Sequence, residues 1–229
     1  MTNSRLGRFL LVSLAALLAL IVPWYYLSPY LAVPVITGAG ELMQFSFRWV
    51  QGYERQDTIG TLVTTLLVFV PHNGGLALAD MAPEVDYRTY GYGLVLLWAL
   101  LIASLPRKLP GKMALGVLIL VPSQMIGMCF RWLRDALLTG GPAVWQQTSL
   151  PNWVAEVIAY GYQFGYLMLT PHVPVLLWAL LDREFLRKLW VETTLAAALE
   201  QTRIADGHAG DIGSANNRHR MTGDILIPK

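Results

Sequence analysis

Four runs of apolar residues, each close to the length needed to cross a lipid bilayer, dominate this sequence. A helix needs about 20 residues to cross roughly 30 Å of hydrocarbon, because each residue advances it by about 1.5 Å. The runs occupy residues 9–27, 90–105, 113–132 and a stretch within 153–181. The sequence therefore predicts an α-helical polytopic membrane protein with about four transmembrane helices.

The composition agrees with a membrane environment and excludes several classes of function. Of the 229 residues, 55% are hydrophobic and 14% are charged, whereas about 25% of the residues in soluble domains are charged. The single cysteine rules out an internal disulfide framework, and four scattered histidines leave little for a metal cluster. A net charge of +2 is too small to indicate nucleic acid binding. We therefore expect the lipid bilayer as a partner, no nucleic acid and no cofactor.

Lysines and arginines gather at one set of helix ends and so predict the orientation. Arg5 and Arg8 precede the first run, a basic turn at 106–112 joins the second run to the third, and Arg183 opens a basic C-terminal region. Because cytoplasmic loops are enriched in Lys and Arg, both termini are expected in the cytoplasm. The first run resembles a signal peptide at its front, but no small-residue cleavage site follows closely, so we expect an uncleaved anchor.

The segment between the first two runs, residues 28–89, is too long for a turn and is expected outside the cytoplasm. Residues 30–43 carry apolar side chains at helical spacing, which predicts an interfacial helix. The period then changes to alternation, with many β-branched residues. We expect antiparallel strands near 45–55, 58–70 and 76–86. So few strands are not stable alone, so this small extracytoplasmic β-containing insert must lie on the membrane domain or bind a partner.

The other parts of the chain follow from the same signals. Residues 1–27 form the N-terminal cytoplasmic end and the first transmembrane helix, and residues 90–182 hold transmembrane helices two to four. Residues 183–203 continue as a cytoplasmic amphipathic helix that carries Phe185 and Trp190. Residues 204–229 lack a sustained apolar period, which predicts a disordered tail.

Polar residues inside the third and fourth runs form two stripes. At 100° per residue, Gln124, Arg131 and Asp135 share one helix face. A charge exposed to lipid costs about 2.5–3.5 kcal/mol, so the stripes should face the bundle interior and each other. The candidate binding residues are Gln124, Arg131, Arg134, Asp135, Glu156 and Gln163.

The partners across these stripes depend on where the helices are anchored. Counting from the cytoplasmic turns brings Arg131 level with Gln163, whereas counting from an outer start at residue 153 pairs it with Glu156. We prefer the first register. The stripes are either hydrogen-bonded glue between helices, which is common, or a pocket at the outer leaflet for a peptide or a lipid head group.

Cys129 lies near two arginines, and nearby cations lower the pKa of a thiol, which raises the possibility of a nucleophile. On a helix, however, Cys129 points about 160° away from Arg131, and no base is placed to serve it. We also find no phosphate loop, no nucleophile elbow and no zinc-protease motif. A buried structural cysteine is therefore the preferred interpretation.

Several short stretches, taken in order, resemble the exosortase H-associated membrane protein family over about residues 9–187. They are Trp24-Tyr25-Tyr26-Leu27-Ser28-Pro29 with Pro34-Val35, Tyr90-Gly91-Tyr92-Gly93, Val121-Pro122-Ser123-Gln124 with Gly127, Gly140-Gly141-Pro142, Gly161-Tyr162-Gln163-Phe164-Gly165-Tyr166, Pro171, and Trp178-Ala179-Leu180-Leu181-Asp182-Arg183. The resemblance implies a bacterial inner-membrane protein that accompanies exosortase H, a membrane enzyme resembling cysteine transpeptidases that acts on proteins with a C-terminal sorting signal. It assigns no catalytic residue.

Three functions are compatible with these patterns. The preferred one is a non-enzymatic accessory protein whose external strands dock exosortase H or its sorting-signal substrates by strand addition. The alternative is a membrane enzyme, a divergent cysteine transpeptidase or peptidase, acting at the outer leaflet through Cys129 or through Arg131 and Glu156. A small-solute transporter is disfavoured because there are four predicted spans and no internal repeat.

Overall fold

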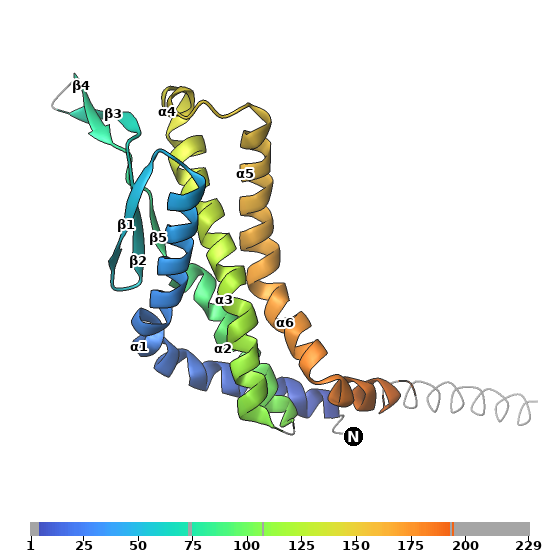
Figure 1. Ribbon diagram of the computed structural model, residues 1–229. Helices are drawn as coiled ribbons and strands as arrows, with labels where there is room; N and C mark the ends of the chain where they lie inside the picture. Colours follow the sequence, from blue (N-terminus) through green and yellow to red (C-terminus); the bar gives the residue numbers. More distant parts are fainter. Residues whose placement is uncertain (1–4, 73–74, 107, 193, 195–229) are drawn as a thin grey trace, which may run out of the picture. The chain divides into compact units, whose positions relative to one another are not determined.

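The computed structural model describes residues 5–72, 75–106, 108–192 and 194, and it divides into two units, Met1–Asp182 and Arg183–Lys229. Within the described residues of the first unit, three helical segments are long and apolar enough to cross a membrane: Leu6–Ser46, Leu109–Thr139 and Trp153–Leu181. The helix α2 (Arg88–Ser104) is apolar but shorter. The prediction of a helical membrane protein with a small β insert after the first helix is confirmed (Figure 1), whereas the number of four spanning helices is not.

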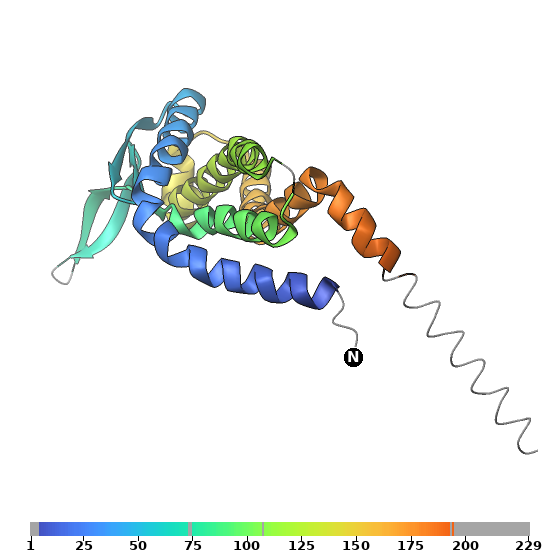
Figure 2. The ribbon, with the colours of Figure 1, turned by 90° about the horizontal axis from the view of Figure 1, so that it is seen from below.

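The first helix, α1 (Arg5–Ser46), is continuous over 42 residues. The sequence predicts a break between a spanning helix that ends near residue 27 and an interfacial helix at 30–43, and this break is absent. Pro23, Pro29 and Pro34 lie inside α1, and each removes a backbone donor, which bends a helix without always ending it. Figures 1 and 2 show the bend, with the N-terminal part of α1 lying alongside α2.

The β insert consists of five antiparallel strands in two sheets. One sheet has the order β1-β2-β5, and the other pairs β3 with β4. The strands are β1 (Val50–Gln56), β2 (Ile59–Thr64), β3 (Leu67–His72), β4 (Gly75–Asp80) and β5 (Glu84–Asp86). A hydrogen bond from Met81 N to Leu66 O, 2.7 Å long, joins the two sheets where the strands break. In the sequence this break is hidden, because residues 58–70 have an uninterrupted strand-like composition.

The predicted first strand begins five residues too early. The alternation of Phe45, Phe47 and Trp49 suggests a strand from residue 45, but α1 continues to Ser46 and Phe47 N donates to Met43 O over 2.9 Å. Phe47 and Trp49 instead lie in the turn into β1, with ring centroids 5.2 Å apart. A pattern of alternate aromatic residues therefore marks a turn here.

The remaining helices of the first unit are interrupted by π-helical segments. They are α3 (Leu109–Leu133), η1 (Arg134–Thr139), α4 (Gly141–Gln147), α5 (Trp153–Gln163), η2 (Phe164–Leu169) and α6 (Thr170–Leu181). The third run is longer than the predicted 113–132, and α4 was not predicted. In the second unit, residues 183–192 are helical, in part of the predicted helix 183–203. The predicted tail, 204–229, lies outside the described residues.

The largest buried cluster joins the C-terminal half of α1 to the β insert and α3. On α1 the buried side chains recur at helical spacing, at Ala32, Val35, Ile36, Ala39 and Met43. Trp132 of α3 is fully buried, and its Nε1 donates to Gly60 O of β2 over 3.0 Å. The insert is therefore packed against the helices and does not stand alone.

Arg88, at the start of α2, connects the bend of α1 to the β insert. Its Nε donates to Ser28 Oγ over 3.2 Å, and its guanidinium lies 4.3 Å from the centroid of the Tyr25 ring. The same side chain forms an ion pair with Asp57, in the turn between β1 and β2, at 3.8 Å. One cation thus fixes three segments that are far apart in the sequence.

Glycines bring α2, α3 and η2 into close contact. A Cβ atom on Gly165 of η2 would lie 3.3 Å from Gly127 Cα of α3, and a Cβ atom on Gly127 would lie 2.8 Å from the Tyr90 ring of α2. Small residues permit such approach between membrane helices, where dispersion contacts stabilise packing. Gly127 lies at the centre of this contact.

We predict that Gly127→Ala lowers the free energy of unfolding by roughly 1–3 kcal/mol, because the added methyl group forces the Tyr90 ring to move. The matched control is Gly111→Ala in the same helix, where an added Cβ meets nothing within 4 Å. Thermal unfolding in detergent, followed by tryptophan fluorescence, measures both. Equal midpoints for the two variants would contradict the packing described here.

Candidate functional site

A cluster of charged and aromatic residues joins α3 to α5. Arg131 Nε donates to Asp135 Oδ2 over 2.7 Å, one helical turn further along the chain. Arg131 Nη1 donates to the hydroxyl oxygen of Tyr162 over 3.0 Å. The Arg131 guanidinium therefore links its own helix to α5 through two polar contacts.

Arg134 approaches the same tyrosine. Its guanidinium is 4.5 Å from the centroid of the Tyr162 ring, and its Nη1 is 3.4 Å from Asp135 Oδ1. Tyr166 stacks on Tyr162 with a centroid distance of 6.0 Å and an interplanar angle of 9°. Both guanidinium groups thus contact one carboxylate and one phenol ring, on which a second phenol ring stacks.

Both helices change their winding at this cluster. The π-helical segment η1 begins at Arg134, and η2 begins at Phe164, two residues after Tyr162. A π-helical turn widens a helix and rotates the side chains that follow it, and such turns occur frequently at functional sites. The cluster therefore lies where both helices leave regular α-helical winding.

The structure brings together three of the six predicted site residues. Arg131, Arg134 and Asp135 form the cluster, in the register that makes Arg131 level with residue 163. Gln163 and Glu156 are exposed and make none of the polar contacts at the cluster, so the register that pairs Glu156 with Arg131 is not observed. The tyrosine next to Gln163 occupies the position expected for the glutamine, because Tyr162 lies about 100° around the helix on the face toward α3.

Gln124 lies in a different place. It is buried beside a small cavity of about 40 Å³ among α1, α2 and α3, with Tyr87 and Pro34 among the lining residues. Seven residues separate Gln124 from Arg131, and over that distance the neighbours of α3 change from α1 and α2 to α5. Burial raises the pKa of Tyr87, so its hydroxyl stays neutral.

Tyr162 and Tyr90 are the cluster residues that sequence reasoning missed. Tyr90 of α2 is buried, lies within electrostatic range of Arg131, Asp135 and Tyr162, and has a hydroxyl without a hydrogen-bond partner among the described residues. The spacing of Tyr162 and Tyr166 is a usable signal, because residues four apart share a helix face and tyrosine rings attract guanidinium groups.

Cys129 is buried against α1, on the far side of α3 from the cluster. Its Sγ lies 3.6 Å from Ala39 O, in the hydrogen-bonding range for a thiol donor. This environment matches a small structural residue more closely than an activated nucleophile. Within the described part of the chain, no three Cys, His, Asp or Glu side chains come together in a way that could hold a metal ion.

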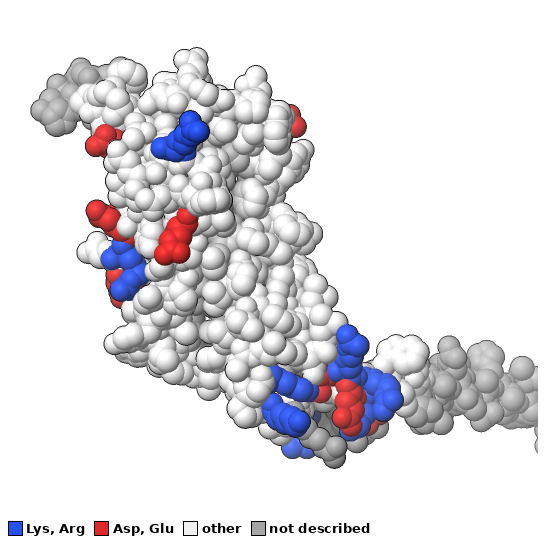
Figure 3. Space-filling view, in the orientation of Figure 1, with Lys and Arg blue, Asp and Glu red and all other residues white. Residues whose placement is uncertain are grey.

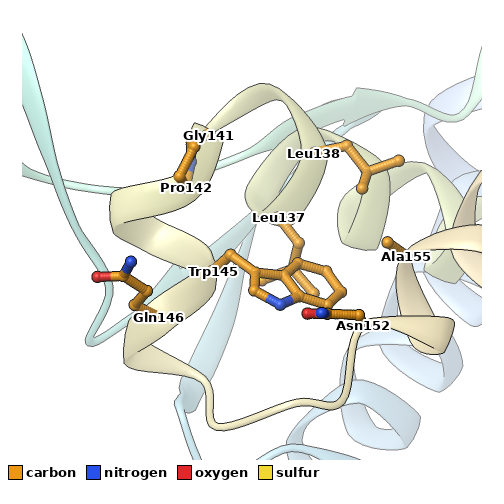
Figure 4. A pocket seen from close by; sticks show the side chains of 8 residues that line it. All are labelled: Leu137, Leu138, Gly141, Pro142, Trp145, Gln146, Asn152 and Ala155. Atoms are coloured by element: carbon orange, nitrogen blue, oxygen red, sulfur yellow. The ribbon is translucent and has the colours of Figure 1, made fainter.

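A groove of about 500 Å³ opens between α4 and the start of α5 (Figure 4). The indole of Trp145 extends into the space between these helices, toward Leu137 and Asn152. None of the described residues that line the groove is charged, so the groove suits apolar contact rather than acid–base chemistry. Its lining residues are Leu137, Leu138, Gly141, Pro142, Trp145, Gln146, Asn152 and Ala155.

Comparison with known proteins places the chain in a family. The sequence profile of the exosortase H-associated membrane proteins matches residues 3–185, which include all the helices and strands of the first unit. The chain belongs to this family. Comparison with curated proteins and with solved structures gives no significant match. The resemblance inferred from the sequence motifs is confirmed. The family consists of membrane proteins associated with exosortase H.

Replacing Tyr162 with phenylalanine separates the two contacts that this residue makes. Tyr162→Phe removes the hydroxyl that accepts from Arg131 but keeps the ring beside Arg134, and we expect a loss of about 0.6–2 kcal/mol in unfolding free energy. Tyr160→Phe is the matched control, since Tyr160 is 70% exposed. Chemical denaturation in mixed micelles measures both, and an equally large loss in the control would exclude a specific contact at Tyr162.

Proposed function

We propose that this exosortase H-associated protein is a non-enzymatic accessory of the bacterial inner membrane that docks the enzyme or its C-terminal-signal substrates. The family assignment supports the association with exosortase H. The observation that carries the docking role is the β3–β4 ribbon, which extends from the rest of the insert and exposes backbone edges together with apolar side chains (Figure 1).

At the base of the ribbon, one amide side chain forms the pair of hydrogen bonds that a neighbouring strand would form. Gln147 of α4 accepts a hydrogen bond from Leu67 N and donates one to Leu67 O, both 2.9 Å long. The backbone groups of Leu67 therefore point away from β4. Because outward and inward groups alternate along an antiparallel pair, the backbone groups of Phe69 point outward as well, free to accept another strand.

The same positions expose apolar side chains. Phe69 of β3 and Leu78 of β4 are directly paired, and their exposed fractions are 58% and 56%. Pro71, the next outward position of β3, has no N–H and ends the usable edge. The ribbon thus offers a short edge, anchored at Leu67 and closed at Pro71, which suits an extended peptide segment.

The proposed orientation places this edge where exported proteins are processed. Both termini are assigned to the cytoplasm, because the basic residues gather near the N-terminus, in the α2–α3 turn and after Asp182. The β insert then lies on the outer side of the inner membrane. A sorting signal near the outer leaflet would meet the ribbon on that side.

Charged substitutions on the ribbon test the docking role. We expect affinity purification from mild-detergent membranes to recover exosortase H or a sorting-signal precursor with the wild-type chain, and Phe69→Lys with Leu78→Lys to reduce the recovery at least fivefold. The control is Ile59→Lys, the same change at an exposed position of β2. If the ribbon variants leave the recovery unchanged, the ribbon is not the interface. If the wild-type chain recovers neither exosortase H nor a precursor, the docking role is contradicted.

The competing enzyme hypothesis makes a different prediction. Cys129→Ser exchanges a buried thiol for a hydroxyl that is able to donate to Ala39 O, so we expect sorting-signal processing in cells to continue at the wild-type rate. Immunoblotting of a precursor and its processed form gives the measurement. Loss of processing in a variant that is expressed normally and still binds its partner would favour an enzymatic role.

A further inference from the structure

The ion pairs that involve α3 and η1 lie in two layers about one hydrocarbon thickness apart. Lys112 and Asp182 form one layer, an ion pair at 3.6 Å. Along the helices, Arg131 lies about 29 Å from Lys112, and Tyr162 lies about 30 Å from Asp182. Figure 3 shows charged side chains over the β insert and toward the α2–α3 turn, with a broad uncharged band between them. Because the bilayer hydrocarbon is about 30 Å thick, the Arg131 cluster lies at the level of lipid head groups.

The cluster carries excess positive charge at that level. Arg131 and Arg134 share one carboxylate, that of Asp135, which leaves one net positive charge among the three side chains. The arginine side chains are 33% and 35% exposed, whereas Asp135 is 19% exposed. The uncompensated charge is therefore on the accessible side of the cluster, where it attracts an anion.

Both guanidinium groups have N–H donors that the contacts described above do not use. The contacts described use Nε and Nη1 of Arg131 and Nη1 of Arg134, and a guanidinium carries five N–H donors. The planar fork of an arginine matches the oxygen atoms of a phosphate, and here two such forks meet at one carboxylate and one tyrosine ring.

The surface next to the cluster suits a lipid. Phe164 and Leu167 are exposed on η2, on the side of the cluster toward the uncharged band, where acyl chains would lie. Tyr162 and Tyr166 present amphipathic rings at the boundary, as tyrosines do at membrane interfaces. An anionic phospholipid combines the features that this surface would bind: a negative charge, apolar chains and a position at the membrane interface.

We propose that Arg131 and Arg134, beside Tyr162, bind the phosphate of an anionic phospholipid head group. Arg131 is also needed to hold α3 to α5, whereas Arg134 makes a longer contact with Asp135 and a ring contact. Arg134 is therefore the residue whose replacement tests binding without removing the helix contact. The proposal is independent of the docking role of the β3–β4 ribbon.

Thermal unfolding of the full-length protein with added lipid provides the test. We expect dioleoylphosphatidylglycerol in neutral mixed micelles to raise the unfolding midpoint of the wild type, and dioleoylphosphatidylcholine at the same concentration to raise it much less. Arg134→Gln should weaken the phosphatidylglycerol response on the order of tenfold in apparent Kd, because a charge-assisted hydrogen bond is lost. Arg134→Lys should keep part of the response.

The controls separate the possible sources of the anion. Arg48→Gln removes the same charge from an exposed position outside the cluster and should respond like the wild type. A stabilisation by inorganic phosphate that equals the one by phosphatidylglycerol would show that a free anion, not a lipid, is the ligand. Equal responses to the two lipids, or an Arg134→Gln response equal to that of the wild type, would overturn the proposal.

Discussion

The contact between Trp132 and Gly60 is the interaction on which the first unit depends. An indole N–H buried without an acceptor costs about 1–3 kcal/mol, and here its acceptor is a strand carbonyl at 3.0 Å. Only a glycine fits, because a Cβ on Gly60 would lie 2.9 Å from the indole and 3.1 Å from Ile36. The sheet, the C-terminal half of α1 and α3 are therefore fixed relative to one another at a single point, and the β3–β4 ribbon takes its position from them.

The Arg131 cluster combines two physical roles. Through Tyr162 it holds α3 to α5, and its excess charge is the basis of the anion site that we propose for a lipid phosphate. Arg131 and Arg134 reach the same ring because residues three apart lie on neighbouring positions of one helix face. Helix packing and recognition thus depend on one tyrosine that carries no charge.

Apolar run length and the change of period after residue 45 were enough to predict the helical membrane fold and the position of the β insert. Helix ends were harder, because Pro29 and Pro34 bend α1 where a break was expected. Spacing on an ideal helix predicted that Arg131, Arg134 and Asp135 lie together, as they do, but it also grouped them with Gln124, which lies among other neighbours. Tyr162 was missed because the candidate residues were selected for charge or for a side-chain amide. The aromatic ring that both guanidinium groups approach does not meet that criterion.

The position of Trp132 in the sequence also sets an order of events during synthesis. Gly60 leaves the ribosome 72 residues before Trp132, an interval of roughly 4–14 s at about 5–20 residues per second. During that time the nascent β insert has its strands but not the α3 surface that buries them. Until Trp132 has been made, the surface of the insert that packs on α3 is therefore uncovered.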